Sequence, residues 1–232
     1  GQVTGGTRFD AAGAPISGHR FGYRFDAIGN RVSSSRGSEP ASRESTYAPN
    51  SLNQYEAIHH SRSIAITGSA HLDADVTVNG APAERSGRYF SRVLDFEDAT
   101  DAGWVDVLVS ARLTGAARNG ADAVAEETGW RFLPPATEKP SHDADGNRTS
   151  DARRTYTWNG ENRLIAIEET ARQRLAAASG GGGLPIRKRL EFTYDAQGRR
   201  VRKATFAFDP DSGEWAPQTT KVFLYDGWNL IL

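Results

Sequence analysis

The sequence contains no cysteine, so disulfide bonds and thiol chemistry are both excluded. Because a chain without cysteine suits an oxidising or a reducing compartment equally, this absence does not decide between the two. Methionine is absent as well, the chain begins at Gly1, and an apolar strand pattern continues to Leu232. A natural translation product starts with methionine, so we expect an internal piece of a longer polypeptide or a processed product.

Long apolar runs and a charge of one sign are missing too. No stretch of 18 apolar residues predicts a membrane-spanning helix, and no signal-peptide pattern is present. The formal net charge of −1 indicates no general attraction to nucleic acid or to an anionic membrane. With 232 residues, of which 38% are hydrophobic, the chain has an ordinary globular composition and is long enough for one or two domains.

A turn motif recurs along the chain. It reads Asp-x-x-Gly followed by Asn or Arg, and it occurs at 26–31, 143–148 and 195–200. Asp suits the first position of a type I turn, and Gly accepts the left-handed conformation at its end, as in a bulged hairpin connection. The motif residues to which we assign a structural role are Tyr23, Phe25, Asp26, Gly29, Asn30, Asp143, Gly146, Asn147, Tyr194, Asp195 and Gly198.

A strand motif alternates with the turn motif. It combines aromatic residues with Asn or Asp, and it occurs at 47–55, 156–164 and 223–230. The spacing varies, so the extra length is expected in hairpin tips and insertions. Three alternating pairs predict a repeat protein of consecutive antiparallel β-hairpins. The structural residues of this motif are Tyr47, Asn50, Asn53, Trp158, Asn159, Asn162, Tyr225 and Asp226.

The repeat pattern stops between residues 59 and 140. Short β-prone runs separated by glycines take its place, and Asn79-Gly80 predicts a tight turn between two of them. The interval is also richer in acidic residues than the rest of the chain. We therefore expect hairpins at 1–58, an inserted immunoglobulin-like β-sandwich at 59–140, and hairpins again at 141–232.

The connecting segments carry weaker signals. Residues 1–20 read as the end of a preceding repeat, and the polar segment 33–45 reads as a loop or hairpin tip. Good helix formers at 171–178 predict a short helix. The glycine-rich segment 179–183 predicts a flexible hairpin tip.

The motifs resemble the YD repeats of bacterial Rhs proteins, which teneurins share. The similarity rests on the aromatic and turn residues at 192–199 and on the runs at 158–165 and 225–231, and it covers about 21–58 and 141–232. It implies an all-β spiral of hairpins that forms a hollow shell. Such shells belong to secreted or surface-displayed proteins, and they enclose a C-terminal toxin or support extracellular contacts.

The chain departs from polymorphic-toxin Rhs proteins in one respect. After the element at 225–231, those proteins have a core region that plugs the shell and cuts off the toxin. Neither that self-cleaving site nor a toxin is present in this sequence. Six motif copies also cannot close a shell, so the resemblance implies a fragment of its wall.

Carboxylates are plentiful, but they do not predict a catalytic or metal site. The Asp and Asn residues of the motifs are suited to satisfying turn backbone donors. Oxygen ligands at Asp143, Asp145, Asn147 and Asp151 alternate as in calcium sites. A helix-loop-helix calcium site is nevertheless excluded, because its glycine is misplaced and Arg154 stands where the bidentate Glu belongs. We expect no catalytic residue, no metal and no cofactor, with a nonstandard calcium site as the alternative.

Three other patterns favour structural interpretations. His59 and His60 are adjacent, and adjacent strand residues face opposite ways, so we do not expect them to share a metal. The glycines at 180–183 follow the predicted helix and lack the lysine of a phosphate-binding loop. The basic residues within 187–203 lie on one predicted hairpin, which favours a solvated strand face over a nucleic-acid site.

Trp104 and Trp130 of the inserted segment are the candidates for stacking on a sugar, since carbohydrate-binding sandwiches use exposed aromatic rings. A core position is the alternative, because Trp104 begins the most apolar strand and Trp130 stands near Phe132. Two functional hypotheses follow. The first is a non-enzymatic shell wall, whose partners are the rest of the polypeptide and an enclosed toxin. The second is a module that binds a glycan or a surface protein through the insert.

Overall fold

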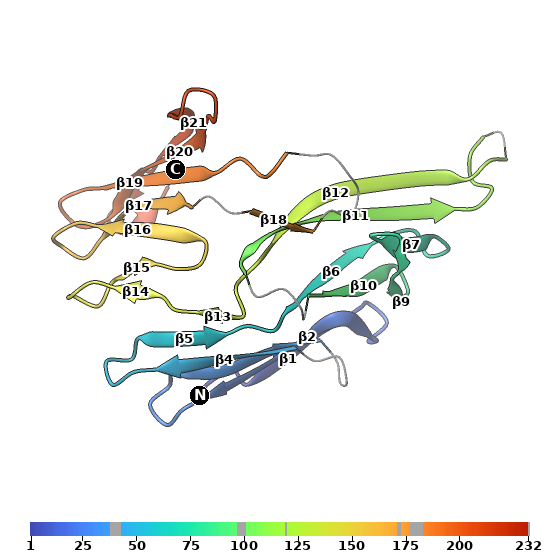
Figure 1. The fold of residues 1–232 in the computed structure, drawn as a ribbon, viewed down its shortest axis with the longest axis horizontal. Coiled ribbons are helices and arrows are strands. Elements are labelled where there is room, and N and C mark those ends of the chain that lie inside the picture. The colour runs from blue at the N-terminus through green and yellow to red at the C-terminus, as the bar shows by residue number, and fades with distance from the viewer. Residues whose placement is uncertain (38–42, 97–100, 119, 171–172, 177–182, 232) are drawn as a thin grey trace. The chain divides into compact units, whose positions relative to one another are not determined.

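The chain folds entirely into strands and turns over the residues that the structure describes. A computed structural model describes residues 1–37, 43–96, 101–118, 120–170, 173–176 and 183–231 (Figure 1). No helix occurs in these ranges, which confirms the predicted all-β class. It follows that none of the described elements is a helix long and apolar enough to cross a membrane.

The chain divides into two compact units, which are described separately. One comprises Gly1–Glu138 and Gln173–Gly183, and the other comprises Lys139–Arg172 and Leu184–Leu232. The hairpins predicted at 1–58 and most of the predicted insert therefore belong to the same unit. The three-segment division remains a prediction: the strands within residues 63–133 pair with one another, but Thr137–Glu138 joins the sheet of the first hairpins and Gln173–Ala176 pairs with Gly103–Leu113.

The first unit contains a six-stranded antiparallel sheet in the order β1-β2-β3-β4-β5-β13. Its strands are β1 (Gly5–Phe9), β2 (Pro15–Phe25), β3 (Arg31–Arg36), β4 (Arg43–Pro49), β5 (Tyr55–His59) and β13 (Thr137–Glu138). Strands β1 to β5 follow one another as hairpins, and β13 adds to β5 after the intervening segment has returned. Residues 1–20 thus belong to this sheet, and the loop predicted at 33–45 is mostly strand, with 38–42 outside the described residues.

The segment between β5 and β13 forms two further sheets in the same unit. One has the order β6-β10-β9, and the other has the order β12-β11-β7-β8. These strands are β6 (Ser63–Ser69), β7 (Asp75–Val78), β8 (Ala81–Pro82), β9 (Glu84–Ser86), β10 (Tyr89–Asp95), β11 (Gly103–Leu113) and β12 (Ala123–Leu133).

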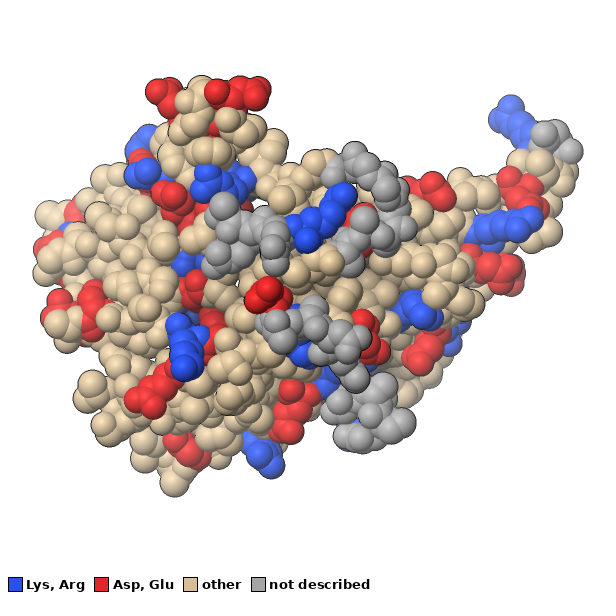
Figure 2. All heavy atoms as spheres, in the orientation of Figure 1, with Lys and Arg blue, Asp and Glu red and all other residues tan. Residues whose placement is uncertain are grey.

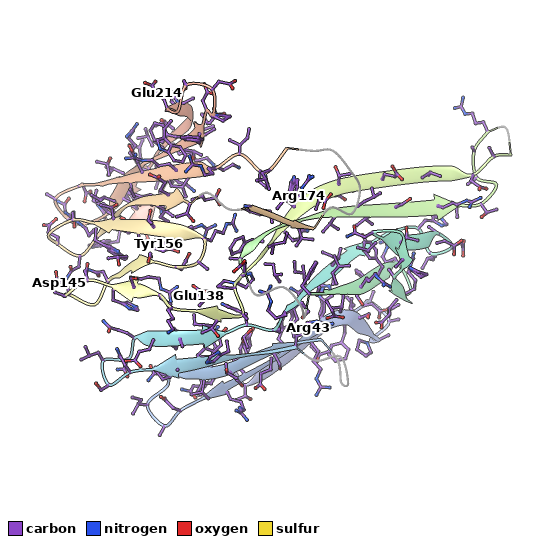
Figure 3. The ribbon with its side chains drawn as sticks, viewed as in Figure 1. Arg43, Glu138, Asp145, Tyr156, Arg174 and Glu214 are labelled. Atoms are coloured by element: carbon purple, nitrogen blue, oxygen red, sulfur yellow. The ribbon has the colours of Figure 1, made fainter. Side chains whose placement is uncertain are left out.

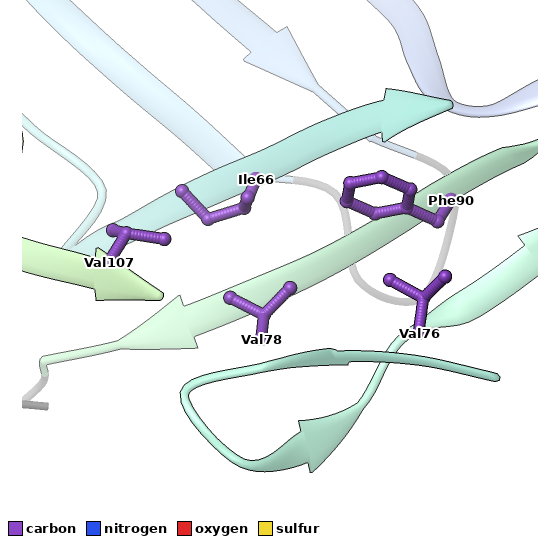
Figure 4. Close-up of a cluster of buried hydrophobic side chains, with 5 residues drawn as sticks. All are labelled: Ile66, Val76, Val78, Phe90 and Val107. Atoms are coloured by element: carbon purple, nitrogen blue, oxygen red, sulfur yellow. The ribbon is translucent and has the colours of Figure 1, made fainter. Parts of the chain in front are cut away.

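A small hydrophobic core joins these two sheets. It consists of the buried side chains of Ile66, Val76, Val78, Phe90 and Val107, which come from β6, β7, β10 and β11 (Figure 4). Alternate residues of each strand point to the same face, so each strand contributes its apolar side to this interior. The two sheets formed by the segment between β5 and β13 therefore share this buried cluster.

The turn predicted at Asn79-Gly80 connects β7 to β8. The φ angles of the two residues are 49° and 76°, the left-handed pair that a type I′ turn requires. Val78 pairs with Ala81 across the turn. The strand that follows, β8, is a two-residue element that the sequence pattern did not predict.

The short helix predicted at 171–178 is wrong where the structure describes it. Residues Gln173–Ala176 form strand β18, which pairs in parallel with the first residues of β11. Backbone pairing across the sheet overrides the local helix preference of these residues. The remainder of that segment, and nearly all of the tip predicted at 179–183, lies outside the described residues.

The second unit contains a seven-stranded antiparallel sheet whose strand order follows the sequence. Its strands are β14 (Ser141–His142), β15 (Arg148–Ser150), β16 (Arg154–Trp158), β17 (Leu164–Glu169), β19 (Lys188–Tyr194), β20 (Arg200–Phe208) and β21 (Trp215–Val222). A separate hairpin follows, formed by β22 (Tyr225–Asp226) and β23 (Asn229–Leu230). Among the described residues of this unit, Pro140 and Ala204 are the two that are buried. The sheet is therefore held together mainly by contacts between neighbouring strands.

Candidate functional site

The turn motifs form hairpin tips that are capped by their own Asp side chain. In the first copy, Asp26 Oδ1 accepts hydrogen bonds from the amides of Ile28 and Asn30, at 3.1 and 2.8 Å. The backbone closes with Gly29 N–H to the Asp26 carbonyl, and Gly29 has a φ of 97°. The side-chain bond from Asn30 is the main cause that holds the pKa of Asp26 below its ordinary value. The carboxylate thus works as an ionised cap.

The other two copies repeat this geometry. Oδ1 of Asp143 accepts from the amides of Asp145 and Asn147, at 3.1 and 2.8 Å. Oδ1 of Asp195 accepts from the amides two and four residues later, at 3.0 and 2.9 Å. In the third copy Arg199 replaces Asn and binds Asp195 Oδ2 through its Nε at 2.7 Å.

Two of the strand motifs contain the same capped turn, and their Asn residues accept hydrogen bonds from turn amides as expected. Asn50 Oδ1 accepts from the amides of Leu52 and Gln54, at 2.9 and 3.0 Å. Asn159 Oδ1 accepts from Glu161 and Arg163 in the same way, both at 3.0 Å. The fourth turn residues, Asn53 and Asn162, replace Gly and have φ angles of 61° and 56°. Asn tolerates this conformation, so Asn-x-x-Asn is a chemical equivalent of Asp-x-x-Gly.

A further copy lies at the start of the chain. Asp10 Oδ1 accepts from the amides of Ala12 and Ala14, both at 2.9 Å, and Gly13 has a φ of 81°. The sequence Asp-x-x-Gly is present there, but Ala14 follows the glycine, where the repeat has Asn or Arg. Six capped turns therefore occur in the described part of the chain, at Asp10, Asp26, Asn50, Asp143, Asn159 and Asp195.

The third strand motif is not a capped turn. Asp226 pairs directly with Asn229, so Gly227 and Trp228 alone connect β22 to β23. Gly227 has a φ of 57°. The motif at 223–230 therefore matches the other two in composition but not in backbone geometry.

Side chains bridge successive tips along one edge of each sheet, and we call these bridges the tip ladder. In the first unit Asn30 Nδ2 donates to Asn53 Oδ1 at 3.0 Å. In the second unit Asn147 Nδ2 donates to Asn162 Oδ1 at 2.9 Å. The ladder continues there from Arg163 to the Asp195 carbonyl at 3.3 Å and from Arg199 to the Gly227 carbonyl. In every bridge, the residue after the left-handed position reaches the next tip.

Aromatic side chains add a second set of lateral bonds in the second unit. Trp158 Nε1 donates to the Arg148 carbonyl at 2.8 Å, and the Tyr194 hydroxyl donates to the Leu164 carbonyl at 2.8 Å. The Tyr225 hydroxyl donates to the backbone carbonyl of residue 200 at 3.0 Å. Each aromatic group thus binds the strand that follows the preceding capped turn, which fixes the spacing between hairpins.

Arginines of the β19–β20 hairpin pack on aromatic rings or pair with carboxylates. The guanidinium of Arg187 lies 3.7 Å from the ring centre of Phe208, and that of Arg200 lies 5.1 Å from Phe223. Arg189 is paired with Glu191 at 2.8 Å. On the face shown in Figure 2, Lys and Arg residues are interspersed with Asp and Glu. These contacts give the arginines a structural role between strands.

The residues of the calcium alternative serve the fold in other ways. Asp151 Oδ1 accepts from the amides of Arg153 and Arg154, and its Oδ2 accepts from the Tyr156 hydroxyl at 2.5 Å. Desolvation first, and the Asp151 carboxylate second, raise the pKa of Tyr156 to about 12. Asp145 stands at the hairpin tip and Tyr156 on the neighbouring strand (Figure 3). Within the described ranges, no group of three or more His, Asp or Glu is arranged to hold a metal ion.

His59 and His60 bind different partners on β13. Nδ1 of His59 lies 3.0 Å from Thr137 Oγ1, and Nε2 of His60 lies 2.7 Å from Glu138 Oε2. The Glu138 side chain is only 11% exposed. The two histidines therefore fasten β5 to the strand that returns from the insert.

Trp104 and Trp130 lie on the same face of the β11–β12 hairpin, because their strand partners are Phe132 and Asp106. The ring of Trp104 contacts Phe132 edge to face, with 5.5 Å between ring centres. The guanidinium of Arg174 lies 4.7 Å from the ring centre of Trp130 (Figure 3). Both rings are half-buried, so part of their surface already has a protein partner. Sugar stacking at these residues remains a prediction.

A cavity of about 510 Å³ opens on the opposite face of this hairpin. It is bounded by β6, β10, β11 and β12, and the ring of Phe90 and the side chain of Val107 are part of its lining. Ligand sites typically occupy roughly 300 to 1,000 Å³. The size of the cavity makes it a candidate binding site that the sequence analysis missed.

Comparison with known proteins assigns this chain to no family. The sequence matches no known protein-family model, and no curated protein matches it.

Proposed function

We propose that this chain is a non-enzymatic wall segment of a hairpin shell of the YD-repeat type. The observation that carries the proposal is the tip ladder, in which neighbouring tips along one edge of each sheet are bridged by a side chain from one fixed position. Such a scheme links each hairpin to its neighbour and contains nothing that limits the number of hairpins. It therefore suits an extended wall.

The burial pattern supports the same role. The second unit has almost no buried core, and its outermost strand β21 is exposed along nearly its whole length. No described strand pairs with the outer edge of β1 or of β21. A sheet of this kind gains stability when further strands add to its edges, because each added strand satisfies exposed backbone groups.

The proposed partners follow from this role. They are the rest of the same polypeptide and a toxin or other effector domain that the wall encloses. The protein would act in a secreted or surface-displayed state, where a shell separates its contents from the surroundings. The ionised Asp residues at the tips would act as turn caps, with no part in catalysis.

Cryo-electron microscopy of the natural polypeptide that contains this chain tests the proposal. We expect additional hairpins hydrogen-bonded to β1 or β21, in a sheet that curves around an enclosed volume. Outer edges of β1 and β21 that both face solvent in that structure would overturn the wall role.

A recognition module is the second candidate, and the cavity between β6 and β12 favours it. In this role the insert would bind a glycan or a protein at a cell surface. The test is titration of the whole chain with a glycan array, followed by Trp fluorescence in wild type and in Trp130→Phe. Binding that survives Trp130→Phe would place the ligand away from the stacking face. The absence of glycan binding would exclude a glycan as the ligand of the insert.

A further inference from the structure

The cavity lies between two strand edges. Its lining includes the consecutive residues 66–69 of β6 and 123–129 of β12. Consecutive lining residues mean that the backbone of each strand, and not only one face of its side chains, borders the space. Strand β6 pairs only with β10, and β12 pairs only with β11, among the described residues. The cavity is therefore a slot beside two strands that each have a free edge.

The free edge of β12 is long and regular. Its eleven residues pair with β11 from Gly103–Leu133 to Leu113–Ala123 without a register shift. The strand contains neither Pro nor Lys, and residues 123–128 are exposed. Proteins usually protect such edges with bulges, Pro or Lys, since an open edge is a template for another strand.

The backbone groups that point outward can be identified from Leu108. Its amide donates to Asn79 Oδ1 and its carbonyl accepts from the Asn79 amide, both at 2.8 Å. Both groups of Leu108 therefore point away from β12. Its partner Thr128 must then direct its own amide and carbonyl away from β11. Because the pattern alternates, Val124 and Glu126 also direct theirs to the free edge.

The open stretch ends at Trp130. The Trp130 carbonyl also points to the free edge, because the backbone groups of every second residue of β12 do so. It accepts a hydrogen bond from Arg131 Nη1 at 3.1 Å. That guanidinium also lies beside Gly129, where an added Cβ would meet only Arg131, at 3.9 Å. The slot therefore offers free backbone groups over 123–129, with Arg131 at its end.

The side chains that face the slot are small, with one acidic exception. Ala123, Ala125, Glu127 and Gly129 share a face with Leu113, Ala111, Val109 and Val107, their partners on β11. Val107 belongs to the buried core, so this is the inner face of the hairpin. Small residues leave room for the side chains of another strand, and Glu127 is a charge that a basic residue would complement.

We propose that this slot binds an extended segment of a partner polypeptide, which adds to β12 as an antiparallel strand. Its backbone pairs with Val124, Glu126 and Thr128. Its inward side chains are a large apolar residue opposite Gly129, Lys or Arg opposite Glu127, and apolar residues opposite Ala125 and Ala123. Main-chain bonds supply affinity in this binding mode, and the alternate side chains supply specificity.

The experiment measures binding of a fluorescein-labelled peptide, Phe-Thr-Lys-Thr-Val-Thr-Val, to the whole chain by fluorescence anisotropy. When the peptide pairs antiparallel with β12, its Phe lies opposite Gly129 and its Lys lies opposite Glu127. We expect saturable binding with a Kd below about 1 mM, since a short peptide must lose much conformational freedom on binding. No saturable binding in this range overturns the proposal.

Two variants at Thr128 isolate the backbone contribution. Thr128→Pro removes an amide that points outward and leaves the β11 ladder intact, whereas Thr128→Val keeps that amide. We expect Thr128→Pro to weaken binding roughly five- to tenfold and Thr128→Val to leave it unchanged. Circular dichroism of both variants shows whether they fold. Equal affinity of the folded Pro and Val variants overturns the proposal.

A charge exchange tests the register at about 0.15 M salt, where long-range attraction is screened. Glu127→Lys should weaken binding roughly five- to tenfold, and a peptide with Glu in place of Lys should restore it. Glu126→Lys is the matched control, because Glu126 stands on the other face of β12. Equal losses in the two variants would mean non-specific attraction and would overturn the assignment.

A second copy of this chain is the competing occupant. If sedimentation shows wild-type self-association that Thr128→Pro abolishes, the edge pairs with itself and the proposal is wrong. The wall role does not depend on this slot, so failure of peptide binding leaves it intact. Solvent-facing edges of β1 and β21 would likewise leave the peptide site intact.

Discussion

The side-chain amide of Asn147 donates a hydrogen bond of 2.9 Å to the side-chain oxygen of Asn162, fifteen residues later. Asn30 makes the same bond to Asn53 in the other unit, at 3.0 Å. In both pairs the donor follows the left-handed position of one capped turn, and the acceptor occupies the left-handed position of the next. The repeat is thus a unit of hydrogen bonding between tips as well as a unit of sequence.

A double-mutant cycle measures this bond directly. Asn147→Ala removes the donor, and Asn162→Gly removes the acceptor but keeps a residue that tolerates a φ of 56°. Urea unfolding of both single variants and of the double variant should give a coupling free energy of about 0.5 to 1 kcal/mol. Additive effects of the two substitutions would mean that the bridge does not contribute.

Gly13→Ala tests the capped turn that the repeat pattern missed. An added Cβ there has no neighbour within 4 Å, but φ is +81°, so the cost is conformational and about 1 kcal/mol. Gly160→Ala is the matched control, because its Cβ also has no neighbour within 4 Å and its φ is not in the left-handed region. We expect a lower melting temperature for Gly13→Ala alone. Equal losses would contradict the assigned turn.

Tyr156 should make stability depend on pH in the alkaline range. Its pKa is raised from 10.0 to about 12, so the folded protein holds this proton more tightly than the unfolded chain does. The stabilisation is complete below about pH 10 and is lost as the pH rises towards 12. Chemical denaturation at several pH values should show this loss in wild type. Tyr156→Phe should show a smaller loss, and an identical pH dependence of the two proteins would refute the assignment.

Gly68→Ala tests the packing of the insert. A Cβ at this position would lie 2.5 Å from the ring of Phe90, a buried core residue. The ring would have to move within the core, at a cost of about 1 to 3 kcal/mol in the free energy of unfolding. Gly129→Ala is the control from the facing strand, where the nearest atom is 3.9 Å away at the tip of a flexible Arg. Comparable stability of the two variants would argue against the packing.

The sequence was least informative where composition and geometry diverge. The motif around Asp226 shares its residues with the other strand motifs, yet it forms a two-residue hairpin, since Asp226 pairs with Asn229. Conversely, the Asp10 turn has the geometry although Ala14 stands where the repeat has Asn or Arg. Local composition indicates that a turn forms, and the pairing of the flanking strands decides which turn it is.

The all-β class and the turns at Asp26, Asp143 and Asp195 follow from the residues alone, because a short side chain that accepts hydrogen bonds from nearby backbone amides acts within five residues. The tertiary structure alone decided that the insert leaves the sheet after β5 and returns as β13, and that residues 173–176 form a strand beside β11. It alone also decided that β12 keeps a free edge along a slot. These features depend on contacts between residues far apart in the sequence, and no local pattern encodes which distant strand will be available for pairing.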